Sequence, residues 1–270
     1  MESKTQKLKD YLSSLQNVAV AFSGGVNSAL LLKTAHDVLG DRVTAVTAES
    51  PSLPRREFKE TIEFCRNEGI KQIICQSAEM KNEKYVKNPE NRCYYCKKEI
   101  FSKIKEVASE TGINYIAEGS NTSDIREYRP SLLACNELGI LSPLRAVGLS
   151  EEEVREIAKN SGILMWNKPC FSCLASRIPY NEEITCEKLQ MVELSEQLLF
   201  DLGFHQFRVR YHGTVARIEV LPQEFQKCIE YSEFINEQLK MFGFTYVSLD
   251  LQGYRTKSMS EALKCTDNNV

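Results

Sequence analysis

Short apolar segments alternate with amphipathic ones through the first half of this 270-residue chain. Four short segments rich in β-branched residues read as buried strands: 18–22, 43–48, 71–76 and 115–118. Three segments between them repeat apolar residues at helical spacing and are closed by a glycine: 28–39, 55–68 and 96–111. This alternation predicts an α/β fold, with a parallel Rossmann-like sheet covered by helices on both faces.

The alternation of short apolar and amphipathic segments ends near residue 180. A helix is expected over 187–202, followed by two strands within 207–220 that are joined near His212 and Gly213. A further helix to about residue 241 and a strand over 246–251 complete a small α+β module. We therefore predict two domains, residues 1–180 and 181–270.

The composition of the chain argues against membrane and nucleic-acid-binding proteins. Hydrophobic residues make up 42% and charged residues 26%, which is typical of a globular protein. No apolar run approaches the roughly 18 residues that cross a membrane, and the N-terminus lacks a secretory signal. The net charge of −3 gives no sign of a nucleic-acid footprint. We expect a cytoplasmic protein with neither a membrane nor a nucleic acid as partner.

A glycine-rich loop joins the first strand to the first helix, and it reads Ser23-Gly24-Gly25-Val26-Asn27-Ser28. The glycines allow the backbone to turn tightly and to approach an anion closely. The helix that follows presents free N–H groups, and the two serines add hydroxyl donors. The loop therefore predicts a phosphate site, although neither the dinucleotide fingerprint nor the Walker A motif fits it.

This loop resembles the PP-loop, S-G-G-x-D-S, of the ATP pyrophosphatases. The resemblance implies that Ser23–Ser28 binds ATP with Mg²⁺, and that a substrate is adenylated with release of pyrophosphate. Asn27 departs from the pattern, because it stands where that superfamily carries Asp. An amide cannot offer the negative charge that helps to hold Mg²⁺. ATP binding is expected to survive, while metal handling or rate is expected to suffer.

Three further segments indicate one family within this superfamily. The chain carries, in order, Glu118-Gly119-Ser120-Asn121-Thr122-Ser123-Asp124, Cys170-Phe171-Ser172-Cys173-Leu174-Ala175-Ser176-Arg177 and Arg208-Val209-Arg210-Tyr211-His212-Gly213. In this order they are similar to the LarE family of sulfur transferases, over essentially the whole chain. The resemblance implies that a carboxylate of pyridinium-3,5-biscarboxylate mononucleotide is adenylated and converted to a thiocarboxylate. It also implies a homo-oligomer and an external supply of sulfide or another sulfur donor.

The expected site draws on several of these segments. Gly119 and Asp124 follow a strand, so they should lie at the carboxyl edge of the sheet, where ligands bind in such folds. We expect Gly119 to contribute to nucleotide binding, and Asp124, Cys173 and Ser176 to take part in the chemistry. Arg208 and Arg210 share one face of a strand by period-two spacing and, with Arg177, could bind a substrate phosphate. The alternative is a solvated strand face.

Cysteine is unusually frequent, with ten residues. Five isolated ones are expected to be ordinary packing residues: Cys65, Cys75, Cys135, Cys228 and Cys265. The others include two C-x-x-C pairs, which in a reducing compartment favour metal binding or catalysis over disulfides.

LarE-like enzymes supply sulfur in two ways, either from a sacrificial cysteine or from a [4Fe–4S] cluster on three cysteines. Cys93, Cys96 and Cys173 match the cluster-binding pattern, and thiolates are natural ligands of such clusters. A Cys₄ zinc site that includes Cys170, or sacrifice of Cys170 or Cys173, remains open. Cys186 is a further thiol without an assigned role.

Three other functions are considered. A tRNA thiolase would carry a basic surface or an RNA-binding module, which this acidic chain does not show. An amide-forming synthetase would need a source of ammonia. A nucleotide sensor without catalytic activity is the remaining alternative, and Asn27 is the residue that motivates it.

Overall fold

The computed structural model describes residues 2–126, 130–169, 172–255 and 258–261. The chain divides into two compact units, the first formed by Met1–Tyr85 and Asn91–Phe171. The second is formed by Val86–Glu90 and Ser172–Val270. This division lies earlier than the predicted boundary near residue 180, and it assigns a short segment from the first half of the chain to the second unit.

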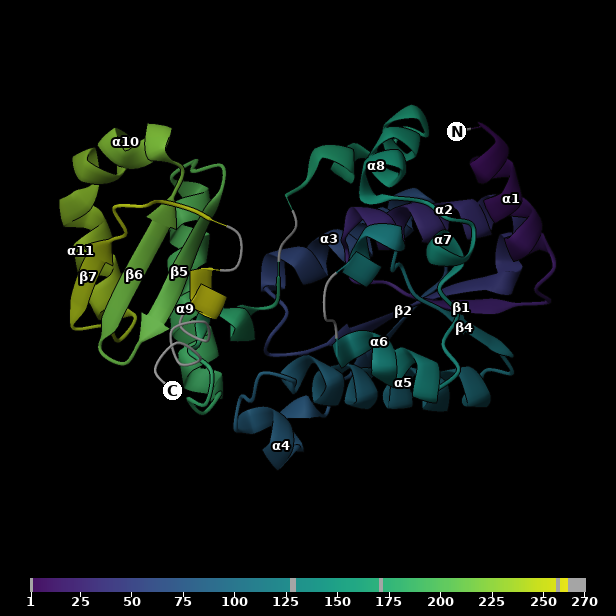
Figure 1. Cartoon of the computed structure of the whole chain (residues 1–270), viewed down its shortest axis with the longest axis horizontal. Helices are drawn as coiled ribbons and strands as arrows, with labels where there is room; N and C mark the ends of the chain where they lie inside the picture. Colours follow the sequence, from purple (N-terminus) through teal and green to yellow (C-terminus); the bar gives the residue numbers. More distant parts are fainter. Residues whose placement is uncertain (1, 127–129, 170–171, 256–257, 262–270) are drawn as a thin grey trace. The chain divides into compact units, whose positions relative to one another are not determined.

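The first unit is built on a parallel sheet of four strands (Figure 1). The strands are β1 (Val18–Ala21), β2 (Val43–Glu49), β3 (Gln72–Gln76) and β4 (Tyr115–Ala117). Their order is β3-β2-β1-β4, and each neighbouring pair runs parallel. The predicted parallel α/β fold is confirmed.

Helices cover both faces of this sheet (Figure 1). One face packs against α1 (Glu2–Ser13), α2 (Val26–Leu39), α3 (Arg55–Asn67), α7 (Pro143–Ala146) and α8 (Glu151–Asn160). The other face packs against α5 (Arg92–Glu110) and α6 (Pro130–Glu137). The short helix α4 (Glu83–Val86) precedes α5. Single 3₁₀ turns lie at Gly40–Arg42, Glu79–Lys81, Thr122–Arg126 and Leu164–Asn167.

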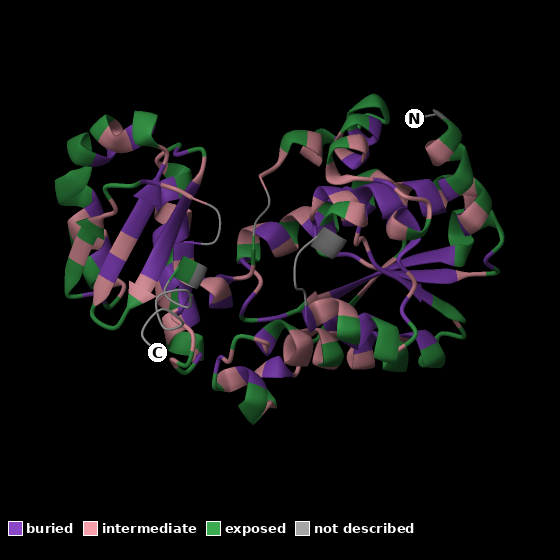
Figure 2. Ribbon diagram, in the orientation of Figure 1, coloured by how far each residue is buried: buried purple, intermediate pink, exposed green. Residues whose placement is uncertain are grey.

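The burial of β1 explains why this sheet needs two layers of helices. Val18 and Val20 belong to the core on the α2 side, whereas Ala19 belongs to the core on the α5 side. All three side chains are fully buried, and Figure 2 shows buried residues along the strands of this unit. Alternate residues of a strand point to opposite faces, so an all-apolar strand requires cover on both.

The second unit contains a mixed sheet of three strands, β5 (Phe207–His212), β6 (Val215–Val220) and β7 (Tyr246–Leu249). β5 and β6 form the predicted antiparallel hairpin, and β7 pairs parallel to β6. The helices of this unit are α9 (Cys186–Asp201), α10 (Phe225–Glu230) and α11 (Ser232–Met241). Its 3₁₀ turns lie at Leu174–Arg177, Pro222–Glu224 and Ser258–Ser260.

One helix boundary differs clearly from its prediction. The sequence placed the start of α5 at Cys96, but the helix begins at Arg92 and includes both Cys93 and Cys96. Arg92 is buried, so tertiary contact extends the helix through a turn that shows no apolar periodicity of its own. Within the described ranges, no helix is long and apolar enough to cross a membrane.

Candidate active site

The glycine-rich loop forms the corner between β1 and α2. Gly24 has φ +77°, a conformation that glycine adopts without strain, and Gly25 is the N-cap residue of α2. The Ser28 hydroxyl donates to the Gly25 carbonyl at 3.0 Å and lies 3.3 Å from the Ser23 hydroxyl. The first N–H groups of α2 have no partner within the helix. The corner therefore has the donors and the dipole that bind phosphate.

The loop after β4 touches this corner directly. The strand order places β1 beside β4, where the direction of strand succession reverses. A Cβ atom built on Gly119 would lie 2.8 Å from the Ser28 backbone nitrogen, so only glycine fits there. The two loops thus meet at the carboxyl edge of the sheet at a topological switch point, where ligands bind in open α/β sheets.

Asn27 bears on the expected magnesium ion. Its Oδ1 atom is buried, and no hydrogen-bond partner for it is found among the described residues. An amide oxygen is a possible ligand of a hard cation, but it carries no charge. The geometry therefore fits a neutral oxygen ligand beside the phosphate corner.

Asp124 takes part in shaping the loop after β4. Its carboxylate accepts a hydrogen bond from the Asn121 N–H at 2.9 Å, which stabilises the 3₁₀ turn Thr122–Arg126. The Asn121 side chain in turn donates to Glu151 at 2.8 Å. These contacts show a loop-ordering role for Asp124, and its predicted role in the chemistry stays a prediction.

The second unit brings Cys173, Ser176 and Arg177 together at one 3₁₀ turn. The Arg177 guanidinium is completely buried and forms two hydrogen bonds with the Glu196 carboxylate, at 2.8 and 2.9 Å. Its Nη1 atom donates to the Cys173 carbonyl at 3.0 Å and to the Ser176 hydroxyl at 2.8 Å. Arg177 therefore holds the turn that follows Cys173, and its donors are used inside the unit.

Arg208 and Arg210 lie beside this turn on β5, and both are almost completely buried. Arg210 binds the Glu219 carboxylate at 2.9 Å and also donates to the Ser176 carbonyl at 3.2 Å. Burial, followed by repulsion from Arg177, lowers the pKa of Arg208 to about 10. Arg177 and Arg210 are each paired with a buried glutamate, Glu196 and Glu219, and the burial of Arg208 and Arg210 does not fit the alternative of a solvated strand face.

The three cysteines proposed as cluster ligands are divided between the units. Cys93 is exposed and Cys96 half-buried near the start of α5, while Cys173 is half-buried in the second unit. Cys170, which the zinc alternative requires, lies outside the described residues. Among the residues that are described, no group of three or more metal-ligating side chains is found.

Four of the isolated cysteines are buried, as expected for packing residues: Cys65, Cys75, Cys135 and Cys228. Cys265, the fifth, lies outside the described residues. Burial raises the pKa of the Cys65 thiol to about 12 and that of Cys135 to about 11. Both thiols therefore stay protonated at neutral pH, which disfavours a role as nucleophile or metal ligand.

Sequence reasoning missed a cluster of charged side chains beside the phosphate corner. Lys168 contacts the carboxylates of Glu57 and Glu60 as well as the Gly24 carbonyl. Lys168 is far in the sequence from the two glutamates, and the three residues match no motif. Glu196, the partner of Arg177, was missed for the same reason.

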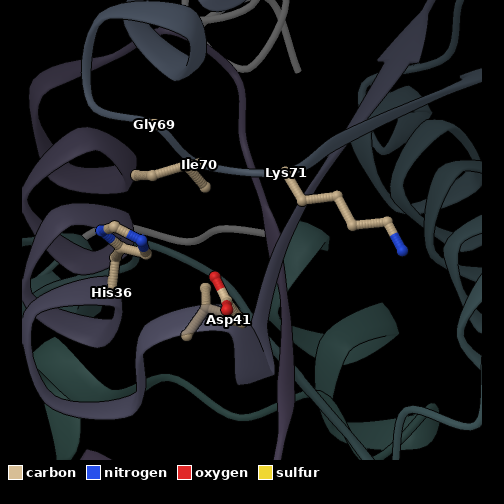
Figure 3. A pocket seen from close by; sticks show the side chains of 6 residues that line it. His36, Asp41, Gly69, Ile70 and Lys71 are labelled. Carbon is tan, nitrogen blue, oxygen red and sulfur yellow. The ribbon is translucent and has the colours of Figure 1, made fainter.

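A separate pocket lies at the opposite edge of the sheet, near the start of β2 and β3 (Figure 3). It is lined by His36, Asp41, Val43, Gly69, Ile70 and Lys71. None of the predicted site residues belongs to it, and the amino-terminal edge of a parallel sheet is not where ligands bind in this class of fold.

Comparisons with known proteins show which sequences this chain resembles. The chain matches no protein-family model. It is 41% identical to an uncharacterized protein of Synechocystis over 97% of this chain and 99% of that protein. It is 34% identical to the pyridinium-3,5-bisthiocarboxylic acid mononucleotide synthase of Lactiplantibacillus plantarum over 97% of this chain and 96% of the synthase.

A more distant similarity covers a smaller part of the chain. A component of the glutamine-hydrolyzing GMP synthase of Pyrococcus furiosus is 25% identical over 71% of this chain and 65% of that protein. The similarity to the Lactiplantibacillus synthase covers nearly the full length of both chains. The glycine-rich corner and its contact with the loop after β4 fit the same family. The chain belongs to the LarE family of sulfur transferases, the family of the pyridinium-3,5-bisthiocarboxylic acid mononucleotide synthase, within the PP-loop superfamily.

Proposed function

We propose that this protein adenylates a carboxylate of pyridinium-3,5-biscarboxylate mononucleotide with ATP and converts the product to a thiocarboxylate. The observation that carries the proposal is the phosphate corner Ser23–Ser28, closed by Gly119 at the switch point of the sheet. The full-length similarity to a synthase named for the bisthiocarboxylic acid product supports the choice of substrate.

The chemistry follows from the poor reactivity of a carboxylate. A carboxylate oxygen attacks the α-phosphorus of ATP, and pyrophosphate leaves. A sulfur nucleophile then attacks the acyl carbon, and AMP leaves with the bonding electron pair. N–H groups at the start of α2 stabilise the charge of the departing pyrophosphate.

The substrate is itself a mononucleotide, so its phosphate needs a second anion site. Arg208 and Arg210 are our choice for it, because both are buried and adjacent to the turn that follows Cys173, and of the two Arg210 is also paired with a glutamate, Glu219. Arg177 is assigned to holding that turn, since its guanidinium is engaged by Glu196 and by the turn itself. Ser176 links Arg177 to Arg210, because its hydroxyl accepts from Arg177 and its carbonyl accepts from Arg210.

Cys93, Cys96 and Cys173 are proposed to hold a [4Fe–4S] cluster. The donor chemistry fits, because Fe–S clusters take thiolate ligands, and the i, i+3 spacing places Cys93 and Cys96 on one face of α5. When bound, the cluster would supply the sulfur for transfer. A donor of sulfide and a homo-oligomeric assembly remain predictions from the family resemblance.

Release of pyrophosphate tests the proposed function. With ATP, Mg²⁺ and the dicarboxylate mononucleotide, we expect pyrophosphate release that depends on the substrate. We expect Asn27→Asp to raise the rate at limiting Mg²⁺, because a carboxylate binds a hard cation more strongly than an amide does.

A nucleotide sensor gives a different result. ATP binding without pyrophosphate release, by both the wild type and Asn27→Asp, would contradict the proposal and favour the sensor. Pyrophosphate release by Asn27→Asp but not by the wild type would mean that this chain has the fold of the enzyme and binds ATP without hydrolysing it.

A further inference from the structure

Lys168 lies at the end of the 3₁₀ turn Leu164–Asn167 in the first unit, and its side chain reaches the phosphate corner. Its ammonium group donates to the Gly24 carbonyl at 3.3 Å. The same group contacts one carboxylate oxygen of Glu57 and one of Glu60 on α3. The side chain is only 13% exposed, so its position is defined by these partners.

The backbone of Lys168 is held independently of its side chain. Arg155 on α8 donates to the carbonyls of Trp166 and Lys168, both at 2.9 Å. The Arg155 guanidinium is oriented by Glu151 at 2.9 Å, and Glu151 accepts from Asn121 in the loop after β4. A connected set of hydrogen bonds thus runs from the loop after β4, through α8, to Lys168 and the Gly24 carbonyl.

The contact with the Gly24 carbonyl determines the direction of a donor. In a planar trans peptide, the carbonyl of one residue and the N–H of the next point in opposite directions. Lys168 holds the Gly24 carbonyl on its own side, so the Gly25 N–H points away from Lys168. That N–H is one of the donors available to a phosphate at the start of α2.

A peptide between two glycines turns over easily, because neither residue has a Cβ to restrict it. If the Gly24–Gly25 peptide turned over, it would replace an N–H donor with a carbonyl oxygen and repel a phosphate. The Gly24 backbone is also packed tightly against α3, since a Cβ there would lie 3.1 Å from Thr61 Cγ2 and 3.3 Å from the Glu57 carbonyl.

We propose that Lys168 is a positioning residue for nucleotide binding, which fixes the Gly24–Gly25 peptide with its N–H directed at the phosphates. This inference rests on the proposed function only for the identity of the nucleotide, ATP. Lys168 also offsets the negative charge of Glu57 and Glu60, which would otherwise repel an anion at the neighbouring corner. Burial raises the pKa of Glu57, and the attraction of Lys168 opposes that shift.

The test compares Lys168→Met with a matched control, Lys33→Met. Lys33 is also a half-buried lysine paired with a glutamate, Glu68, at 2.5 Å, but its contacts lie on α2 and at the end of α3, away from the phosphate corner. Calorimetry would measure the affinity of each variant for ATP and for adenosine, and thermal unfolding would give its Tm. We expect Lys168→Met to bind ATP about tenfold more weakly, the effect of one charge-assisted hydrogen bond. Adenosine affinity should not change, since adenosine has no phosphate.

Three results would overturn the inference. The first is unchanged ATP affinity in Lys168→Met, and the second is an equal loss for ATP and adenosine, which would indicate general damage to the fold. The third comes from Glu60→Gln, which removes one of the groups that hold Lys168. Weaker ATP binding by Glu60→Gln, although a negative charge near the corner is removed, supports positioning through the peptide, whereas tighter binding would mean that the charge of this cluster and not the peptide governs the affinity. Because these are binding measurements, a wild type that binds ATP but releases no pyrophosphate would contradict the proposed function and leave this comparison intact.

Discussion

Arg177, which the sequence suggested for the substrate phosphate, is engaged by the fold in a buried ion pair. It is the largest completely buried side chain among the described residues, and it pairs with Glu196. The Glu196 carboxylate also accepts from the Val209 N–H at 3.0 Å, so the pair joins α9, β5 and the turn that follows Cys173. A buried ion pair of this kind is costly to break, because the remaining charge is left without compensation.

The Glu196–Arg177 pair predicts how stability depends on pH. Burial alone would raise the pKa of Glu196, but attraction to Arg177 outweighs it, and the pKa is lowered. The resulting stability is present above the unfolded pKa of about 4.3 and is lost as the pH falls through the lower folded value. Glu196→Gln should therefore unfold about 3 kcal/mol more easily at neutral pH, with a difference that shrinks below about pH 4.

Urea unfolding of the wild type and Glu196→Gln, from neutral pH down to well below the ordinary carboxyl pKa of roughly 4, would measure this difference. Glu230→Gln, an exposed residue of the same unit, is the control and should follow the wild type at every pH. A constant difference between wild type and Glu196→Gln across the whole range would contradict the assignment.

At the scale of elements, the phosphate corner depends on how closely two loops approach. β1 and β4 are neighbours in the sheet, and the loops that follow them meet at Gly119 and Ser28. The spacing of these strands is set by the parallel ladder, so neither loop can move back without disturbing backbone hydrogen bonds. Steric exclusion at Gly119 is therefore a property of the sheet as much as of the loop.

Gly119→Ala tests this contact. The added Cβ would lie 2.8 Å from a backbone nitrogen, so the loops must separate. We expect a loss of about 1–3 kcal/mol in the free energy of unfolding, together with weaker ATP binding.

Gly25→Ala is the matched control for the stability measurement. Gly25 has a φ of −85°, which alanine adopts readily, and an added Cβ would meet only the Ser23 hydroxyl at 3.8 Å. It should lose less stability than Gly119→Ala, because the only expected cost is that of replacing glycine with alanine at an N-cap. Equal stability of Gly119→Ala and Gly25→Ala would mean that the two loops are not held in contact.

At the scale of the whole molecule, the residues proposed for the chemistry are divided between two compact units. The phosphate corner proposed for ATP belongs to the first unit, whereas Cys173 and the arginines proposed for the substrate phosphate belong to the second. The proposed cluster ligands are divided in the same way, with Cys93 and Cys96 in one unit and Cys173 in the other.

Metal analysis of cysteine variants tests this division. On protein reconstituted without oxygen, the wild type should hold about four irons and four sulfides per chain. Alanine at Cys93, Cys96 or Cys173 should each remove the iron. Cys186→Ala is the control, because this exposed thiol of the second unit is outside the proposed ligand set.

Other outcomes lead to the alternatives. Unchanged iron in Cys173→Ala would exclude it as a ligand, and one zinc per chain would indicate a structural Cys₄ site. Protein without metal that loses the mass of one sulfur during turnover would identify a sacrificial cysteine.

Elements and the local phosphate motif could be predicted from the order of residues alone. Both depend on information close together in the chain: strand and helix periodicity, glycines at helix ends, and a strand–loop–helix corner. The PP-loop between β1 and α2, the parallel sheet and the β5–β6 hairpin are examples. The start of α5 could not be predicted, because the burial of Arg92 decides it against a weak local pattern.

Contacts between side chains that are distant in the sequence, in contrast, are decided by the tertiary structure. Gly119 must be glycine because of Ser28, Arg177 is occupied by Glu196, and Lys168 reaches Gly24. None of these relations leaves a signal in local periodicity or motif spacing, since each joins residues on different elements. A single sequence specifies the donors and acceptors, but their partners are selected by strand order, helix packing and the exclusion of water from buried charge.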